Sequence, residues 1–98
     1  MKPYTGKFKS TSFHDTVIET SISELRKVCG EPSMEQNDGS NKVNIEWEME
    51  TKNGELFTIY DWKYYRTIKE DEEIKFNIGG ENKEVTEQAL IELKKALK

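Results

Sequence analysis

One stretch near the middle of the chain constrains the fold more than any other, because its residues alternate strictly between apolar and polar. Residues 43–50 read Val-Asn-Ile-Glu-Trp-Glu-Met-Glu, Asn53-Gly54 follows, and residues 56–60 read Leu-Phe-Thr-Ile-Tyr. Period-two alternation predicts a β-strand with one buried and one solvated face, and Asn-Gly is typical of a hairpin turn. The sequence therefore predicts an antiparallel hairpin whose dry face must be covered by other parts of the chain.

The length of the hairpin loop decides which side chains share a face. A two-residue loop would pair Trp47 with Tyr60. A three-residue loop, residues 52–54 with Gly54 in the left-handed conformation, pairs Trp47 with Ile59 instead. We expect this second register, because only it gathers the large apolar side chains of both strands on one face.

Two helices are indicated by their caps and their apolar stripes. Ser21 and Glu24 form a capping box at the start of a short helix over residues 22–29, and Gly30 ends it. The apolar stripe of the last segment predicts a longer helix that starts at Thr86 as N-cap and runs to about residue 97.

Two further segments complete the predicted sheet. Residues 13–20 carry the β-branched and aromatic residues of a strand, and residues 74–78 alternate again before Gly79-Gly80, which we expect to be a turn. Together these elements predict an α+β fold, a three- or four-stranded antiparallel sheet with one short and one longer helix packed on one face. We expect residues 1–98 to form a single small domain, with residues 1–12 as a flexible arm or an edge strand.

Charge and cysteine content argue against several classes of function. The chain has 15 basic and 19 acidic residues, interspersed, and a net charge of −4. A nucleic-acid binder needs a basic face, so nucleic acid is not an expected partner. No apolar run is long enough for a membrane span, and the first residues contain no apolar leader. The single cysteine, Cys29, lies in the apolar stripe of the short helix, so we expect it to be buried. One cysteine cannot form a disulfide within the chain, so we expect the protein to be cytoplasmic.

Residue types that commonly perform catalysis or bind metals are isolated in this sequence. His14 is the only histidine, and we interpret it as a residue on a strand surface. The acidic residues show no spacing typical of metal ligands or of an acid–base pair, so we expect no metal, no cofactor and no catalytic residue. Gly79 and Gly80 could let the backbone approach an anion, although they lack a phosphate-loop frame.

One short segment is richer in aromatic and charged residues than a connecting loop requires. Its candidate binding residues are Tyr60, Asp61, Trp62, Lys63, Tyr65 and Arg66, to which we add the backbone of Gly79 and Gly80. Aromatic faces and an arginine can hold a base while a lysine meets a phosphate, and such residues also dominate protein-binding hot spots. A third interpretation is that Trp62 and one or two tyrosines cap a thin core. From the residues alone, all three alternatives remain open.

The segments Tyr60–Lys63 and Ile78–Gly80 carry a family resemblance. Together with Gly30–Pro32 and Lys42–Trp47, they resemble a family of small proteins encoded by tailed bacteriophages, over most of the chain from about residue 11 onward. This chain departs from the family at Phe76-Asn77, where the family has Trp-His, so no role of that histidine transfers. The resemblance implies a viral protein that acts in a host cell, and it implies no established activity.

These observations lead to one leading expectation of function. We expect a non-enzymatic phage accessory protein in the host cell cytoplasm, which acts in counter-defence by sequestering a nucleotide-type signal or by occluding a host defence protein. We also expect a homodimer or higher oligomer, because a thin core and exposed sheet edges favour pairing. The alternatives are a structural or assembly component of the phage and, third, a small metal-dependent nucleotide hydrolase.

Overall fold

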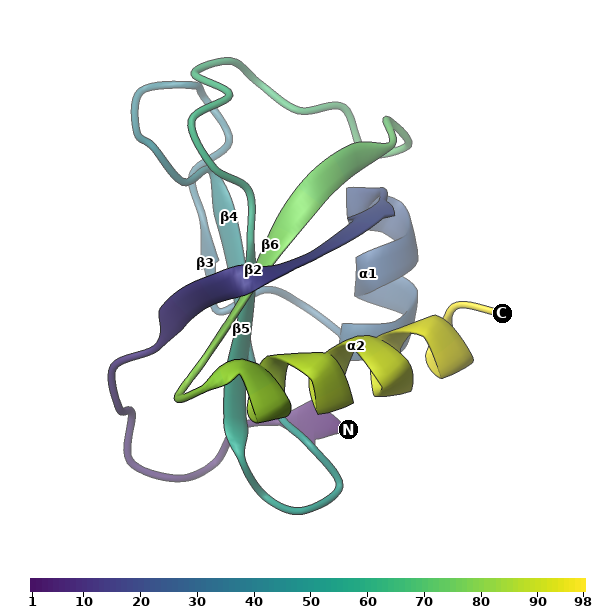
Figure 1. Ribbon diagram of the computed structural model, residues 1–98. Helices are drawn as coiled ribbons and strands as arrows, with labels where there is room; N and C mark the ends of the chain where they lie inside the picture. The colour runs from purple at the N-terminus through teal and green to yellow at the C-terminus, as the bar shows by residue number, and fades with distance from the viewer.

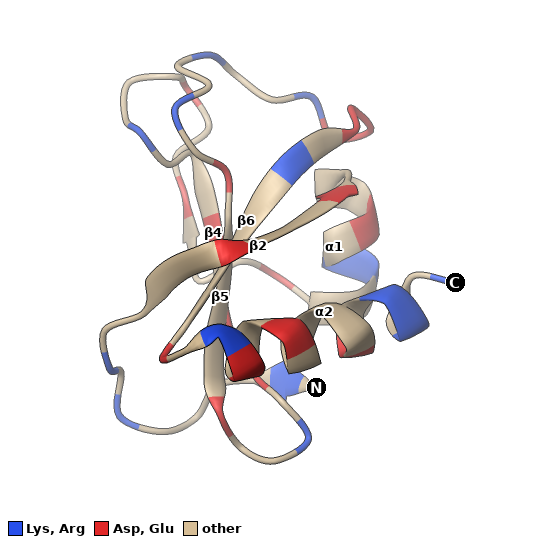
Figure 2. Ribbon diagram, viewed as in Figure 1, with Lys and Arg blue, Asp and Glu red and all other residues tan.

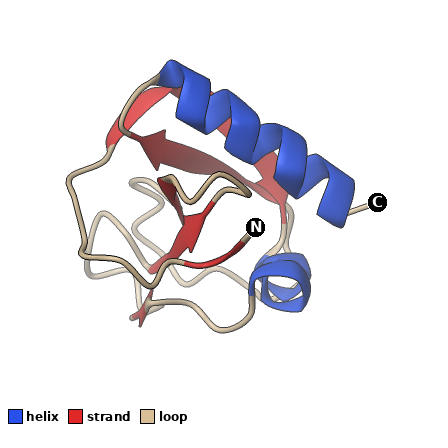
Figure 3. Ribbon diagram, turned by 90° about the horizontal axis from the view of Figure 1, so that it is seen from below, coloured by secondary structure: helices blue, strands red, loops and turns tan.

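The sheet is antiparallel and twisted, with its strands in the order β1–β4–β5–β6–β2, and β3 also pairs with β4. The computed structural model describes residues 1–98 (Figure 1). The strands are β1 (Lys2–Pro3), β2 (Ser12–Thr20), β3 (Met34–Glu35), β4 (Ile45–Glu50), β5 (Leu56–Tyr60) and β6 (Ile74–Gly80). Helices α1 (Ile22–Cys29) and α2 (Lys83–Ala96) pack on one side of this sheet (Figure 3).

The predicted α+β class, with one short and one longer helix, is confirmed. The sheet has six strands instead of three or four, because β1 and β3 add two residues each at its edge. A two-residue strand is too short to carry a period-two pattern, so β3 was not recognisable in the sequence, whereas an edge strand within residues 1–12 was one of the two expected alternatives. Residues 1–12 supply both the edge strand β1 and an irregular arm over residues 4–11.

The central hairpin adopts the register predicted for the three-residue loop. Trp47 pairs with Ile59, Met49 pairs with Phe57, and Gly54 has a φ of 79°. All four paired side chains are buried in the core. A shift of the register by one residue would move all the apolar side chains of one strand to the solvated face, so their burial decides the pairing.

A core of 16 buried residues fills the space between the sheet and both helices. The Trp47 ring packs edge-on against Phe76 with ring centres 6.2 Å apart, and its indole N–H donates to the Gly30 carbonyl at 2.9 Å. This hydrogen bond ties the end of α1 to β4. Cys29 is buried as predicted, and its burial raises the pKa of the thiol to about 12.

Helix α2 begins earlier than the sequence predicted. Its N-cap is Asn82, whose side-chain oxygen accepts a hydrogen bond from the Val85 N–H at 3.0 Å. The predicted N-cap, Thr86, is wrong: it is fully buried in the first turn, and its Oγ1 lies 2.7 Å from Thr16 Oγ1 on β2. Asparagine and threonine both cap helices well, so contact with the sheet decides which one does so here.

Gly79 and Gly80 continue β6 and do not form the predicted turn. They pair with β5 on one side and with β2 on the other. A Cβ at Gly79 would lie 2.5 Å from Thr58 Oγ1, and a Cβ at Gly80 would lie 2.9 Å from Thr86 Cγ2. Close packing on both faces of the strand therefore requires glycine, and this paired backbone is not open to an anion.

Candidate functional site

The aromatic segment lies in the loop between β5 and β6, which runs beside the loop between β3 and β4 at one end of the sheet (Figure 1). Asp61 fixes the start of this segment and is fully buried. Its Oδ1 accepts hydrogen bonds from the backbone N–H groups of Asn44 at 2.7 Å and Ile45 at 3.1 Å, and its Oδ2 accepts from the Asn44 side chain at 2.9 Å. The carboxylate thus clamps the two loops together and is not accessible to a ligand, contrary to its predicted role.

Further hydrogen bonds hold the two loops in register. The Lys63 N–H donates to the Lys42 carbonyl at 2.7 Å. The Asn37 side chain accepts from the Ile68 N–H at 2.7 Å and donates to the Ile68 carbonyl at 2.6 Å, as a strand neighbour would. The paired loops therefore form a fixed platform at this end of the sheet.

The outer side of this platform exposes a cluster of aromatic and cationic side chains, the Trp62 surface, which consists of Lys42, Tyr60, Trp62, Lys63 and Tyr65. Trp62 is 45% exposed and Tyr65 is 53% exposed. The Nζ atoms of Lys42 and Lys63 lie 5.9 and 5.6 Å from the centre of the Trp62 ring, and the Tyr60 ring meets Trp62 edge-on at 6.2 Å. Lys42 and Tyr65 line one shallow hollow. The interpretation that Trp62 and one or two tyrosines cap the core is wrong for Trp62, whereas Tyr64 does pack against the core.

The backbone of the Trp62 surface is held in an unfavourable conformation. Lys63 and Tyr65 have φ values of 58° and 52°, in the left-handed region that residues other than glycine rarely adopt. Each such residue costs on the order of 1 kcal/mol, and such strain persists only where the surrounding contacts enforce it. The loop pairing provides those contacts, and strain of this kind is concentrated at binding and catalytic sites.

Arg66 belongs to the same loop but is engaged within the chain. Its Nη1 donates to Glu72 Oε1 at 2.9 Å, its Nη2 contacts the other carboxylate oxygen, and the guanidinium lies 5.5 Å from the centre of the Tyr64 ring. These hydrogen bonds lower the pKa of Glu72 to about 2. Lys42 and Lys63 make no ion pair, so they are the free cations beside Trp62.

Lysine and arginine positions recur along the β3–β4 and β5–β6 loops, at the top of the view in Figure 2. The acidic turn at residues 70–73 lies at the far end of the β5–β6 loop, where Glu70 binds Arg26 of α1 at 2.8 Å. Asp61, the acidic residue next to Trp62, is buried. The Trp62 ring is therefore flanked by two cations on a chain with a net charge of −4, and the nearest acidic side chain on the same surface is Glu46, which pairs with Tyr60 across the sheet.

The structure brings together four of the eight predicted binding residues. Tyr60, Trp62, Lys63 and Tyr65 share the Trp62 surface. Asp61 supports it from within, Arg66 is exposed but paired with Glu72, and Gly79 and Gly80 lie inside β6. Sequence reasoning missed Lys42, which stands 20 positions before Trp62. Only the pairing of the two loops places its ammonium over the ring, and no pattern in the sequence signals that pairing.

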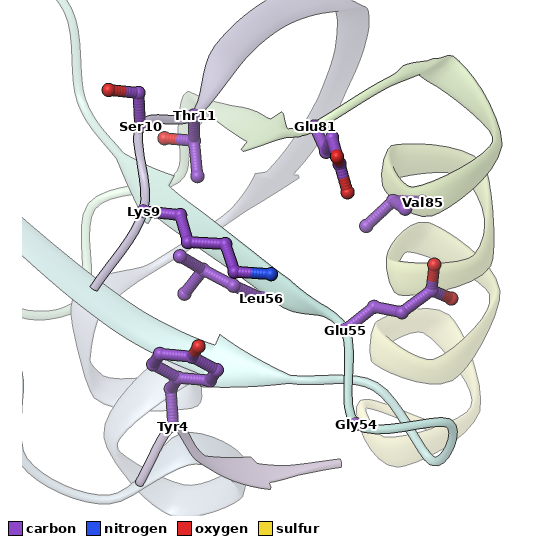
Figure 4. A pocket seen from close by; sticks show the side chains of 9 residues that line it. All are labelled: Tyr4, Lys9, Ser10, Thr11, Gly54, Glu55, Leu56, Glu81 and Val85. Carbon is purple, nitrogen blue, oxygen red and sulfur yellow. The ribbon is translucent and has the colours of Figure 1, made fainter. Parts of the chain in front are cut away.

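The most enclosed cavity lies away from this surface, where the arm meets the hairpin loop and the start of α2 (Figure 4). Its volume is about 160 Å³. Pockets for drug-sized ligands measure about 300–1,000 Å³, so this cavity is too small for a nucleotide.

Neither helix has the length and the apolarity that crossing a membrane requires. No group of three or more histidine, cysteine or acidic side chains is placed to hold a metal ion. Comparison of the chain with protein-family models, with curated proteins and with solved structures found no match. The candidate site therefore rests on the geometry of the chain itself.

Proposed function

We propose that this chain is a non-enzymatic binding protein that occludes a partner protein with its Trp62 surface. The observation that carries the proposal is the exposure of Trp62 and Tyr65 on a loop whose backbone is strained and clamped. Exposed aromatic residues on a rigid support lose little conformational entropy on binding, which is a property of protein-binding hot spots.

The charge of the surface supports a partner with an acidic face. Lys42 and Lys63 flank the Trp62 ring without carboxylate partners of their own. A partner that places carboxylates around an apolar spot would neutralise both lysines while it covers the ring, and its association would be steered by charge.

We further propose that this binding takes place in the host cell cytoplasm, as phage counter-defence. This part rests on the resemblance of Tyr60–Lys63 and Ile78–Gly80 to a family of bacteriophage proteins.

Sequestration of a nucleotide is the second candidate function. The arrangement of two lysines beside Trp62 favours it, because a base can stack on an indole while ammonium groups meet its phosphates. The hollow that Lys42 and Tyr65 line is shallow, so a single chain would leave much of a nucleotide in solvent. Occlusion of a protein therefore remains the first proposal.

The test compares Trp62→Ala with Ile91→Ala, a matched truncation of an exposed apolar side chain on α2. Tagged proteins are used to capture partners from a lysate of the phage's bacterial host. We expect Trp62→Ala to weaken the affinity for the captured protein by about tenfold or more, as loss of a hot-spot residue does. Its free energy of unfolding should change by less than about 0.5 kcal/mol, because the side chain lies outside the core.

Equal capture by both variants would contradict the proposal. Native mass spectrometry of gently purified protein separates the two candidates. A co-purified mass of nucleotide size that leaves on denaturation, and that Trp62→Ala loses, would favour sequestration over occlusion.

A further inference from the structure

The enclosed cavity of about 160 Å³ joins three segments that are distant in the sequence. The arm supplies one wall, the hairpin loop a second, and the junction between β6 and α2 a third (Figure 4). Its lining residues are Tyr4, Lys9, Ser10, Thr11, Gly54, Glu55, Leu56, Glu81 and Val85. The cavity is thus a product of the tertiary fold and lies apart from the Trp62 surface.

The floor of the cavity is apolar and its rim is charged. Leu56 is 8% exposed and Val85 is 2% exposed, so both are fixed in the fold. Figure 4 shows the Lys9 side chain extending toward the cavity from the arm, with the carboxylates of Glu55 and Glu81 on the side of α2.

These three charged side chains are not paired with one another or with any other group. Neither an ion pair nor a side-chain hydrogen bond involves the Lys9 ammonium, the Glu55 carboxylate or the Glu81 carboxylate. Opposite charges therefore face one small cavity without closing across it. A small molecule that carries both an ammonium and a carboxylate would satisfy them together.

We propose that this cavity binds a small aliphatic zwitterion, such as a free α-amino acid with a branched side chain. Its carboxylate meets Lys9, its ammonium lies between Glu55 and Glu81, and its aliphatic part rests on Leu56 and Val85. The volume suits such a molecule, because a cavity of about 150 Å³ accommodates a ligand of the size of benzene.

Anchoring of the arm supports this assignment. The Tyr4 N–H donates to the Glu48 carbonyl at 3.0 Å, and Thr11 Oγ1 lies 3.1 Å from Thr58 Oγ1. Both ends of the arm are thus fixed on the sheet, and Lys9 lies between them. Binding of the zwitterion would tie the middle of the arm to the hairpin and to α2.

The test uses L-valine as the probe and the full chain labelled with ¹⁵N. We expect saturable shifts of the Lys9, Leu56 and Val85 amide signals, with a Kd in the millimolar range. Isobutylamine lacks the carboxylate and isovalerate lacks the ammonium, so each should bind at least tenfold more weakly than valine.

Two variants remove one charge each without touching the core, Lys9→Met and Glu81→Gln. Both should lose the valine response, whereas Lys7→Met, a matched change on the same arm outside the cavity, should keep it. Equal binding of valine and isovalerate, or an undiminished response in Lys9→Met, would overturn the assignment. Circular dichroism of each variant ensures that a lost response is not a lost fold.

Discussion

Asp61 and Trp62 are adjacent in the chain, yet one is fully buried and the other is 45% exposed. Both were candidate binding residues, since the sequence gives no sign of which side chain turns inward. The Asp61 carboxylate accepts three hydrogen bonds from Asn44 and Ile45, and this clamp leaves Trp62 outside. At the scale of the residue, the burial of one side chain determines the availability of its neighbour.

Replacement of Asp61 by alanine should lower the free energy of unfolding by about 3 kcal/mol, because buried amides of Asn44 and Ile45 would lose a charged acceptor. Urea denaturation measures this loss. Asp38→Ala is the control in the neighbouring loop, where the carboxylate accepts its hydrogen bonds from Ser40 at the surface. Its effect should stay below about 1 kcal/mol. Equal effects of the two variants would show that Asp61 is not a clamp.

Glu46 on β4 has a pKa raised above its ordinary value by burial and, second, by the neighbouring Glu48. A carboxyl whose pKa is higher in the folded than in the unfolded state destabilises the fold as pH rises through the folded pKa. Glu46→Gln should therefore raise the free energy of unfolding at pH 7, by less than about 1 kcal/mol. At pH 3, where Glu46 is protonated in both states, the difference should vanish. Urea denaturation at the two pH values measures the difference in free energy of unfolding between the variant and the unchanged protein. A stabilisation found only at pH 3 would contradict the argument.

At the scale of the element, β6 shows how packing sets a strand's length. The alternation of residues 74–78 predicted the strand, but the strand continues through Gly79 and Gly80. Thr58 and helix α2 lie so close to these two positions that only residues without a side chain fit there. The two short strands β1 and β3 and the N-cap of α2 likewise depend on neighbours that are distant in the sequence.

Gly79→Ala should lower the free energy of unfolding by about 1–3 kcal/mol, because the new methyl group would overlap Thr58 Oγ1. The double variant Gly79→Ala/Thr58→Ala removes the obstructing hydroxyl and should recover part of that loss. Urea denaturation of the single and double variants forms the cycle. Additive losses would mean that Thr58 is not the limiting contact.

At the scale of the whole molecule, the two edges of the sheet differ. The edge at β4 is covered by β1, by the Tyr4 N–H and by β3, so little of its backbone is open. The opposite edge is β2, whose pairing with β6 is interrupted between Phe13 and Val17, where Asp15 has a φ of 63°. Bulges of this kind limit edge-to-edge association. The expected homodimer stays a prediction, and the bulge makes the straight edge of β2 short.

Features that depend on near neighbours in the chain were predictable from the amino-acid sequence. The α+β class, the register of the hairpin, the short helix with its Ser21 cap and the burial of Cys29 follow from periodicity, capping and turn chemistry, which act over a few residues. The candidate site was predicted only as a segment. Lys42 reaches Trp62, Asp61 turns inward, and Lys9 and Glu81 line one cavity only after segments far apart in the chain pack together. Tertiary structure alone decided these contacts, because no local pattern encodes which distant segments become neighbours.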